Sequence, residues 1–251
     1  MAARRLFVTL ALTLAACGDA IERAPLPEAV AAAAPVWFIC DSVDAPAIVV
    51  LADSPEDGRA RLIQYDKAAG APTFEGEVAL GQPEGAAGSV FTPIQIDGVE
   101  AGAIRQINPG MLENPGSAYT PPVTSVRFRE MELNCRWMPR TRLLAFTERR
   151  SLLVYEGSDG DLIYTTFDFA APLTPIDLTE NGRSTTFSVE TRDGSEELTP
   201  DGVAFVFSAR EGFSYRVAAR RDGTGALEVA QNGAMLQSEP LLAFQLGGAE
   251  E

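Results

Sequence analysis

Apolar and polar residues alternate over short stretches along most of this chain. In Val126-Arg127-Phe128-Arg129 and in Phe213-Ser214-Tyr215-Arg216-Val217, apolar side chains fall on one face and polar ones on the other. A two-residue period is typical of a half-buried β-strand. Other runs are rich in β-branched, aromatic and aliphatic residues: 36–40, 47–51, 61–65, 123–135, 152–155 and 162–169. No window shows a long helical repeat, so the pattern predicts an all-β protein.

Turn signals separate these runs. Asp-Gly or Asn-Gly pairs occur at 57–58, 97–98, 159–160, 181–182, 193–194, 201–202, 222–223 and 232–233. Such pairs supply the positive φ angles of tight hairpins. Toward the C-terminus, short polar turns separate strands expected at 203–208, 213–219, 226–230, 235–238 and 241–246. This order predicts an antiparallel meander, which must bury one face in a sandwich or close into a barrel.

The first seventeen residues have a different pattern. Arg4 and Arg5 precede an uncharged, mostly apolar run of eleven residues, 6–16, which ends in Leu14-Ala15-Ala16-Cys17. The run is too short to span a bilayer as a helix and has the order of a signal segment. Its last four residues resemble the lipobox of bacterial lipoproteins. That resemblance implies cleavage before Cys17 and acylation of Cys17 with chains such as palmitate; the alternatives are an ordinary secretory signal cut elsewhere and an uncleaved anchor.

The lipoprotein interpretation divides the chain into five parts. We expect a signal peptide at 1–16, a lipidated cysteine with a Pro/Ala-rich tether at 17–35, an N-terminal β region at 36–138, a C-terminal β-meander region at 139–246 and a tail at 247–251. The two β regions form either one large domain or two small ones. Gly18 after the cysteine favours the outer membrane over the inner, on the periplasmic side.

Charge and cysteine content restrict the chemistry. The chain has a net charge of −15, and removing residues 1–16, which carry two arginines and no acid, makes it −17. We therefore expect no binding to nucleic acid, whereas a basic protein is a possible partner. The absence of histidine excludes Ser-His-Asp and Cys-His catalysis and His-ligated metals. With Cys17 assigned to lipid, Cys40 and Cys135 are expected to form a disulfide, with free buried thiols as the alternative.

The segment 108–122 is the candidate binding loop. It holds four prolines and two glycines, a composition that excludes a core strand. Its adhesive residues would be Met111, Leu112 and Tyr119; the alternative is an ordinary surface loop. Long loops without regular structure are often functional or disordered.

Other chemistry is weakly indicated. Asp159 lies in a turn signal, and Asp161 and Asp168 flank a strand, so turn formation explains these carboxylates better than catalysis does. Lys67 is the only lysine, and no nucleophile motif accompanies it. Arg220-Arg221 could bind a carboxylate or phosphate, or simply offset the acidic surface. No catalytic residue, metal site or cofactor is predicted.

The start of the β region resembles the periplasmic C-type lysozyme inhibitors. Trp37-Phe38-Ile39-Cys40-Asp41, an aliphatic strand and then Ala60-Arg61-Leu62 carry this likeness over about thirty residues. It implies a small, often lipid-anchored β-barrel. The family's Ser-Gly-x-x-Tyr motif is missing near residues 85–91, and the chain is about twice too long for one such barrel, so no inhibitory residue is transferred.

The sequence thus favours an envelope lipoprotein with an acidic all-β body that binds or scaffolds, and a non-enzymatic role. Its ligand and oligomeric state are left open. The alternatives are a lysozyme-inhibitor-like binder of a basic protein, and a carboxylate-dependent enzyme acting on cell-wall polysaccharide. The enzyme would require two carboxylates facing one another in a cleft.

Overall fold

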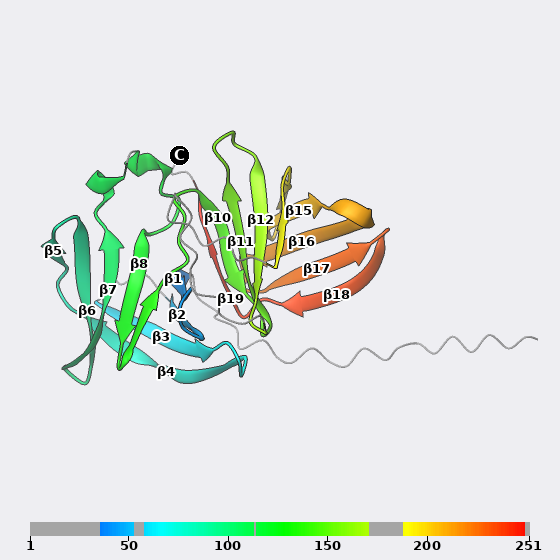
Figure 1. Cartoon of the computed structure of the whole chain (residues 1–251). Coiled ribbons are helices and arrows are strands. Elements are labelled where there is room, and N and C mark those ends of the chain that lie inside the picture. The colour runs from blue at the N-terminus through cyan, green and yellow to red at the C-terminus, as the bar shows by residue number, and fades with distance from the viewer. Residues whose placement is uncertain (1–35, 53–57, 113, 171–187, 249–251) are drawn as a thin grey trace, which may run out of the picture.

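The computed structural model describes residues 36–52, 58–112, 114–170 and 188–248 (Figure 1). Within these ranges the chain is nearly all β, in three antiparallel sheets, and no barrel is closed. The predicted fold class is therefore confirmed in its sandwich form. No helix in the described ranges is long and apolar enough to cross a membrane. Cys17 lies outside the described residues.

The first sheet is built from residues 36–134 and has the order β1-β2-β3-β4-β6-β7-β8-β9, with β5 paired to β6. Its strands are β1 (Val36–Asp41), β2 (Ala47–Ala52), β3 (Arg59–Asp66), β4 (Ala71–Leu80), β5 (Glu84–Ala86), β6 (Ser89–Ile96), β7 (Val99–Ile107), β8 (Val123–Phe128) and β9 (Met131–Asn134). A bridge between Ser42 and Cys135 brings the two ends of this curved sheet together.

Residues 141–246 form the other two sheets. The second sheet has the order β13-β12-β11-β10-β19, with β10 (Thr141–Phe146), β11 (Arg150–Glu156), β12 (Leu162–Asp168), β13 (Val189–Thr191) and β19 (Ala243–Leu246). The third sheet is a meander of β14 (Ser195–Thr199), β15 (Gly202–Ser208), β16 (Phe213–Arg220), β17 (Gly225–Gln231) and β18 (Ala234–Pro240). Figure 1 shows β15–β18 crossing β10–β12 at a steep angle.

The structure corrects the end of the predicted meander. We expected residues 241–246 to follow as its final strand, but β19 leaves the third sheet and pairs with β10 through Leu143↔Leu246 and Phe146↔Ala243. Backbone hydrogen bonds from β10 select this partner, and local sequence patterns carry no information about pairing across 100 residues.

The turns lie where the glycine pairs predict them. Asp97 and Gly98 have φ of 52° and 78°, and Asn232 and Gly233 have 50° and 81°. Two consecutive positive φ angles define the type I′ hairpin turn, whose twist matches that of the flanking strands. Pairs 57–58 and 181–182 fall wholly or partly outside the described residues.

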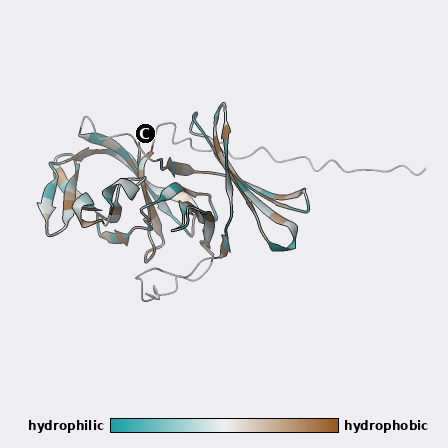
Figure 2. Cartoon of the chain, turned by 90° about the horizontal axis from the view of Figure 1, so that it is seen from above, coloured by the Kyte–Doolittle hydropathy of each residue, from teal (hydrophilic) through white to brown (hydrophobic). Residues whose placement is uncertain are grey.

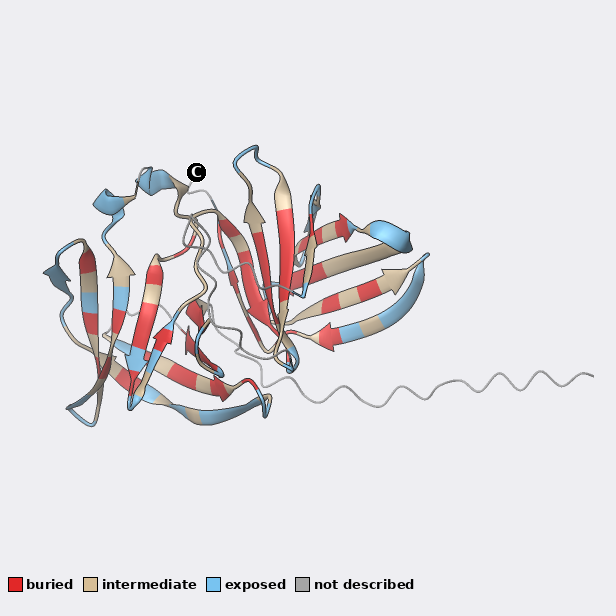
Figure 3. Cartoon of the chain, in the orientation of Figure 1, coloured by how far each residue is buried: buried red, intermediate tan, exposed pale blue. Residues whose placement is uncertain are grey.

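Three apolar clusters hold the layers together. One lies within the curved first sheet and includes Phe38, Leu62 and Phe128. A second joins the first sheet to the second sheet, and a third lies between the second and third sheets. Brown and teal residues alternate along many strands (Figure 2), and buried bands alternate with exposed ones (Figure 3).

Strands that lie between two layers are apolar on both faces. All six residues of β2 are buried: Val49 and Leu51 pack inside the first sheet, and Ile48 and Val50 pack toward the second. The same division applies along β10. Such strands read as continuous apolar runs because neither face meets water. The apolar cluster between the first and second sheets contains residues of both β regions, so the two regions pack directly against one another. The predicted boundary between them at 138/139 stays a prediction.

Candidate functional site

The predicted disulfide is present between Cys40 and Cys135, with an S–S distance of 2.04 Å and a sequence separation of 95 residues. It connects β1 to the residue that follows β9, so it fastens the two ends of the first sheet together. Trp37 packs against the same cluster as Cys40. Trp137 donates a hydrogen bond from its indole nitrogen to Thr120 Oγ1 at 3.1 Å.

A buried ion-pair cluster lies beside the disulfide. Asp41 Oδ1 is 2.6 Å from Lys67 Nζ, and Asp41 Oδ2 is 2.8 Å from Arg136 Nε. The side chain of Asp41 is only 1% exposed, that of Lys67 7% and that of Arg136 13%. The two cations lie over aromatic rings from the end of β12: Lys67 is 5.6 Å from the Phe169 ring centre, and Arg136 is 3.3 Å from that of Phe167.

This cluster connects the disulfide-bonded end of the first sheet to the second sheet. Burial by itself raises the pKa of Asp41, but the attraction of Lys67 and Arg136 outweighs it, so the pKa lies below the usual 3.8. Sequence reasoning missed the cluster. Nothing in the sequence pattern assigned Lys67 to an ion pair; the usable signals were an acid directly after Cys40 and the single lysine of the chain.

The residues proposed for binding in the loop 108–122 are only partly exposed. Met111 is 67% exposed, whereas Leu112 and Tyr119 are half-buried. Tyr119 donates a hydrogen bond to Glu156 Oε2 at 3.1 Å, and its backbone nitrogen donates to the carbonyl of Pro139. Two short 3-10 turns, Pro109–Met111 and Pro115–Ser117, organise the segment. Of the three predicted residues, only Met111 has a side chain that is largely exposed.

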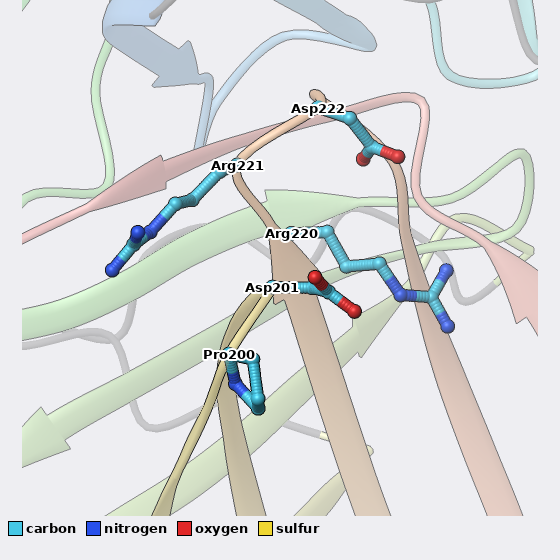
Figure 4. Close-up of a pocket in the computed structure, with 5 residues that line it drawn as sticks. All are labelled: Pro200, Asp201, Arg220, Arg221 and Asp222. Carbon is cyan, nitrogen blue, oxygen red and sulfur yellow. The ribbon is translucent and has the colours of Figure 1, made fainter.

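The arginine pair at the tip of the third sheet lies in a shallow hollow of about 530 Å³ lined by Pro200, Asp201, Arg220, Arg221 and Asp222. Figure 4 shows the two guanidinium groups pointing to opposite sides, with Arg220 on the side of the two carboxylates. The two arginines therefore do not converge on one anion. Their backbones serve the turn, since Arg221 N donates to Asp201 O.

The three candidate carboxylates lie in different surroundings. Asp159 is exposed in its turn, and Asp161 lies 3.8 Å from Arg192. Asp168, in contrast, contacts Arg150 between the second and third sheets, with 3.2 Å from Nε to Oδ1. The other side of Arg150 faces Glu239, with 3.5 Å from Nη2 to Oε1.

Glu239 is the carboxylate that sequence reasoning missed. Its side chain is 7% exposed, and it accepts a hydrogen bond from Thr147 Oγ1 at 2.6 Å and another from Gln237. Asp168 and Glu239 thus meet through one guanidinium rather than across an open cleft. The described residues contain no group of three or more His, Cys, Asp or Glu that could hold a metal ion. The arrangement is an ion-pair network that connects β11 and β12 of the second sheet to β18 of the third.

No protein-family model matches the sequence, and no curated protein matches it. Among solved structures, Kluyvelomyces marxianus Hsv2 is similar with a TM-score of 0.23 and 12% sequence identity, over 86% of this chain and 63% of that chain. The chain thus spans less than two thirds of that structure.

Proposed function

We propose that this protein is an envelope lipoprotein, anchored on the periplasmic side of a membrane through acyl chains on Cys17, whose acidic all-β body binds or scaffolds a partner. The observation that carries the proposal is the use of the cysteines. Cys40 pairs with Cys135, which leaves Cys17, at the end of the signal-like segment, for lipid. A disulfide also fits an oxidising compartment outside the cytoplasm.

The partner that the charge favours is a basic protein. The chain carries 35 acidic residues against 20 basic ones. Glu84, Asp97, Glu130 and Glu132 are exposed on the first sheet. Acidic surfaces steer basic partners by long-range attraction and repel anionic ones. The outer membrane is favoured by Gly18, and the likeness to lysozyme inhibitors makes a lysozyme-like protein the first partner to test.

Anchoring is tested by membrane fractionation of the full chain. We expect the wild type in the membrane fraction and Cys17→Ser in the soluble fraction or still carrying its signal peptide. Cys135→Ser, which removes a cysteine without touching the lipidation site, is the matched control and should still fractionate with membranes. Retention of processed Cys17→Ser on membranes would refute lipid anchoring.

Partner binding is tested separately with purified full chain and lysozyme. We expect binding at low ionic strength that weakens steeply as salt is raised, because exposed charges are screened beyond about 10 Å at 0.1 M salt. An acidic protein of similar size should not bind. If lysozyme does not bind either, the basic-partner version is wrong, whatever the anchoring experiment shows.

A further inference from the structure

The third sheet ends in β18, a strand with one free edge. β18 pairs with β17 and, among the described residues, with no other strand. It is the outermost strand of the third sheet in Figure 1, and much of it is exposed in Figure 3. An edge strand presents unpaired backbone N–H and C=O groups to another chain, so native proteins usually cover such edges, shorten them, or protect them with charge or proline.

Several other edges in the described ranges are covered or short. A bridge between Ser42 and Cys135 brings the two ends of the first sheet together. The outer side of β19 is covered by β1, because the side chain of Gln245 accepts a hydrogen bond from the backbone nitrogen of Ile39 and donates one to the carbonyl of Trp37. Strands β5 and β13 have only three residues each.

Two longer edges carry charge. Strand β4 pairs with β6 only at its last two residues, and its unpaired part contains Pro72, Glu75 and Glu77. Strand β14, at the opposite end of the third sheet from β18, contains Glu196 and Glu197. A carboxylate or a proline on an edge opposes the addition of a further strand, and an acidic edge also repels its own copy.

Strand β18 has no such charge. Its residues 234–238 are uncharged, and Glu239 is buried in an ion pair, so its carboxylate does not protect the edge. Met235 is 51% exposed and Leu236 57%. A β-bulge leaves Leu236 without an opposite residue on β17, and Pro240 ends the strand. The bulge and the proline limit the length of the free edge but leave it uncharged and partly apolar.

The strand next to the edge is neutral as well. Glu228 is the only charged residue of β17, and its Oε2 lies 3.4 Å from Nη1 of Arg216 on β16. The last two strands of the third sheet therefore present no unpaired charge. This is unusual for a chain with a net charge of −15, whose copies repel one another over most of their surface.

We propose that β18 is a dimerisation edge, at which β18 of one copy pairs antiparallel with β18 of a second copy. The two five-stranded third sheets would then join into one continuous sheet, with Met235 and Leu236 of each copy packed against the other. A second copy fits because an antiparallel strand related by a two-fold axis is complementary to itself, and because no like charges meet at this edge. This edge is independent of the anchor at Cys17 and of the basic partner.

The first test is sedimentation of the purified full chain in a detergent matched in density to the solvent. We expect a monomer–dimer equilibrium that shifts toward dimer as salt rises from about 0.1 M to about 1 M, because screening weakens the repulsion between two acidic copies. Binding of a basic partner should show the opposite dependence on salt, so the two proposals fail separately.

A pair of leucine variants tests the assignment to β18. Leu236→Lys adds a charge to this edge and should weaken the dimer about 10-fold or more, because two like charges then approach one another and two apolar contacts are lost. Leu198→Lys is the matched control. Leu198 is 83% exposed on β14, and its replacement changes the net charge by the same amount at the opposite edge of the same sheet. This control should dimerise like the wild type.

Cross-linking tests the geometry independently. Ser238 and Ser195 are both exposed, and they lie at the two ends of one row of paired residues that crosses the third sheet. With a short bismaleimide, Ser238→Cys should give a covalent dimer and Ser195→Cys should not. A wild type that stays monomeric at high salt, an equal loss of dimer in the two leucine variants, or cross-linking through Ser195→Cys instead would each overturn the proposal.

Discussion

Replacing Asp41 by asparagine is the sharpest test of what fastens the first sheet to the second. The Asp41→Asn variant would keep the shape of the side chain but lose the charge that contacts Lys67 at 2.6 Å and Arg136 at 2.8 Å. Both cations would then lie buried without a counter-charge. Removing one partner of a buried pair costs about 3–5 kcal/mol, and here two cations are affected, so we expect about 4–5 kcal/mol.

The loss arises from the uncompensated cations rather than from the missing attraction alone. A triple variant, Asp41→Leu with Lys67→Met and Arg136→Met, replaces the whole cluster with apolar side chains of similar size. Such replacements are often neutral or stabilising. We therefore expect the triple variant to recover most of the stability that Asp41→Asn loses.

Acid should reproduce part of this effect. The pKa of Asp41 is lowered on folding below its ordinary 3.8, so the unfolded chain binds this proton more tightly than the folded one. The contribution of Asp41 to stability is then fully present above about pH 4 and is lost as the pH falls through the folded pKa. Wild type should lose stability below pH 4 more steeply than the triple variant.

Denaturation of the oxidised protein by urea, followed by the fluorescence of Trp37 and Trp137, measures these differences. A loss below about 1 kcal/mol in Asp41→Asn, comparable to an exposed pair, would refute the argument that the cluster is desolvated. A triple variant as unstable as Asp41→Asn would refute the explanation by uncompensated cations.

Three further changes test other parts of the fold, each by the same denaturation assay. Replacing Cys40 and Cys135 together by alanine should cost about 4–5 kcal/mol, because the bond closes a loop of 95 residues; a cost near zero would show that the ends of the first sheet hold without it. Gly102→Ala should cost about 1–3 kcal/mol, since the new Cβ would lie 2.0 Å from a backbone carbonyl oxygen, whereas Gly85→Ala, with open space around it, should stay within about 0.5 kcal/mol. Phe146→Ala should cost about 3–5 kcal/mol, since its ring is 1% exposed in the cluster between the first and second sheets; a surface-like effect would contradict that packing.

Much of the local structure follows from the sequence. The turn at 232–233 is predicted because Asn-Gly tolerates positive φ at both positions, and the strands on either side of it follow from their alternation. The run 47–51 is recognisable as a strand because of its aliphatic and β-branched residues. The unbroken apolar run also indicates that both faces of this strand are buried. The cysteine pairing follows from counting, once Cys17 is assigned elsewhere.

The site clusters do not follow from the sequence in the same way. Asp41, Lys67 and Arg136 come from three distant segments. Arg150 and Asp168 are paired on the neighbouring strands β11 and β12, but Glu239 reaches them only because the third sheet packs on the second. Glu239 lies in a strand whose first residues are exposed, so its neighbours in the sequence suggest a carboxylate on the surface. Its burial depends on where the third sheet crosses the second.

The sequence by itself determined the strands, the turns, the acidic charge, the lack of histidine and the signal-like segment that ends at Cys17, because each is a property of neighbouring residues. The tertiary structure decided that β19 leaves the meander for β10, that Asp41 joins two cations beside a disulfide, and that Glu239 meets Arg150 between two sheets. These features depend on contacts between residues that lie far apart in the sequence, such as Leu143 and Leu246. Such contacts are selected by the burial of whole faces rather than by any local pattern.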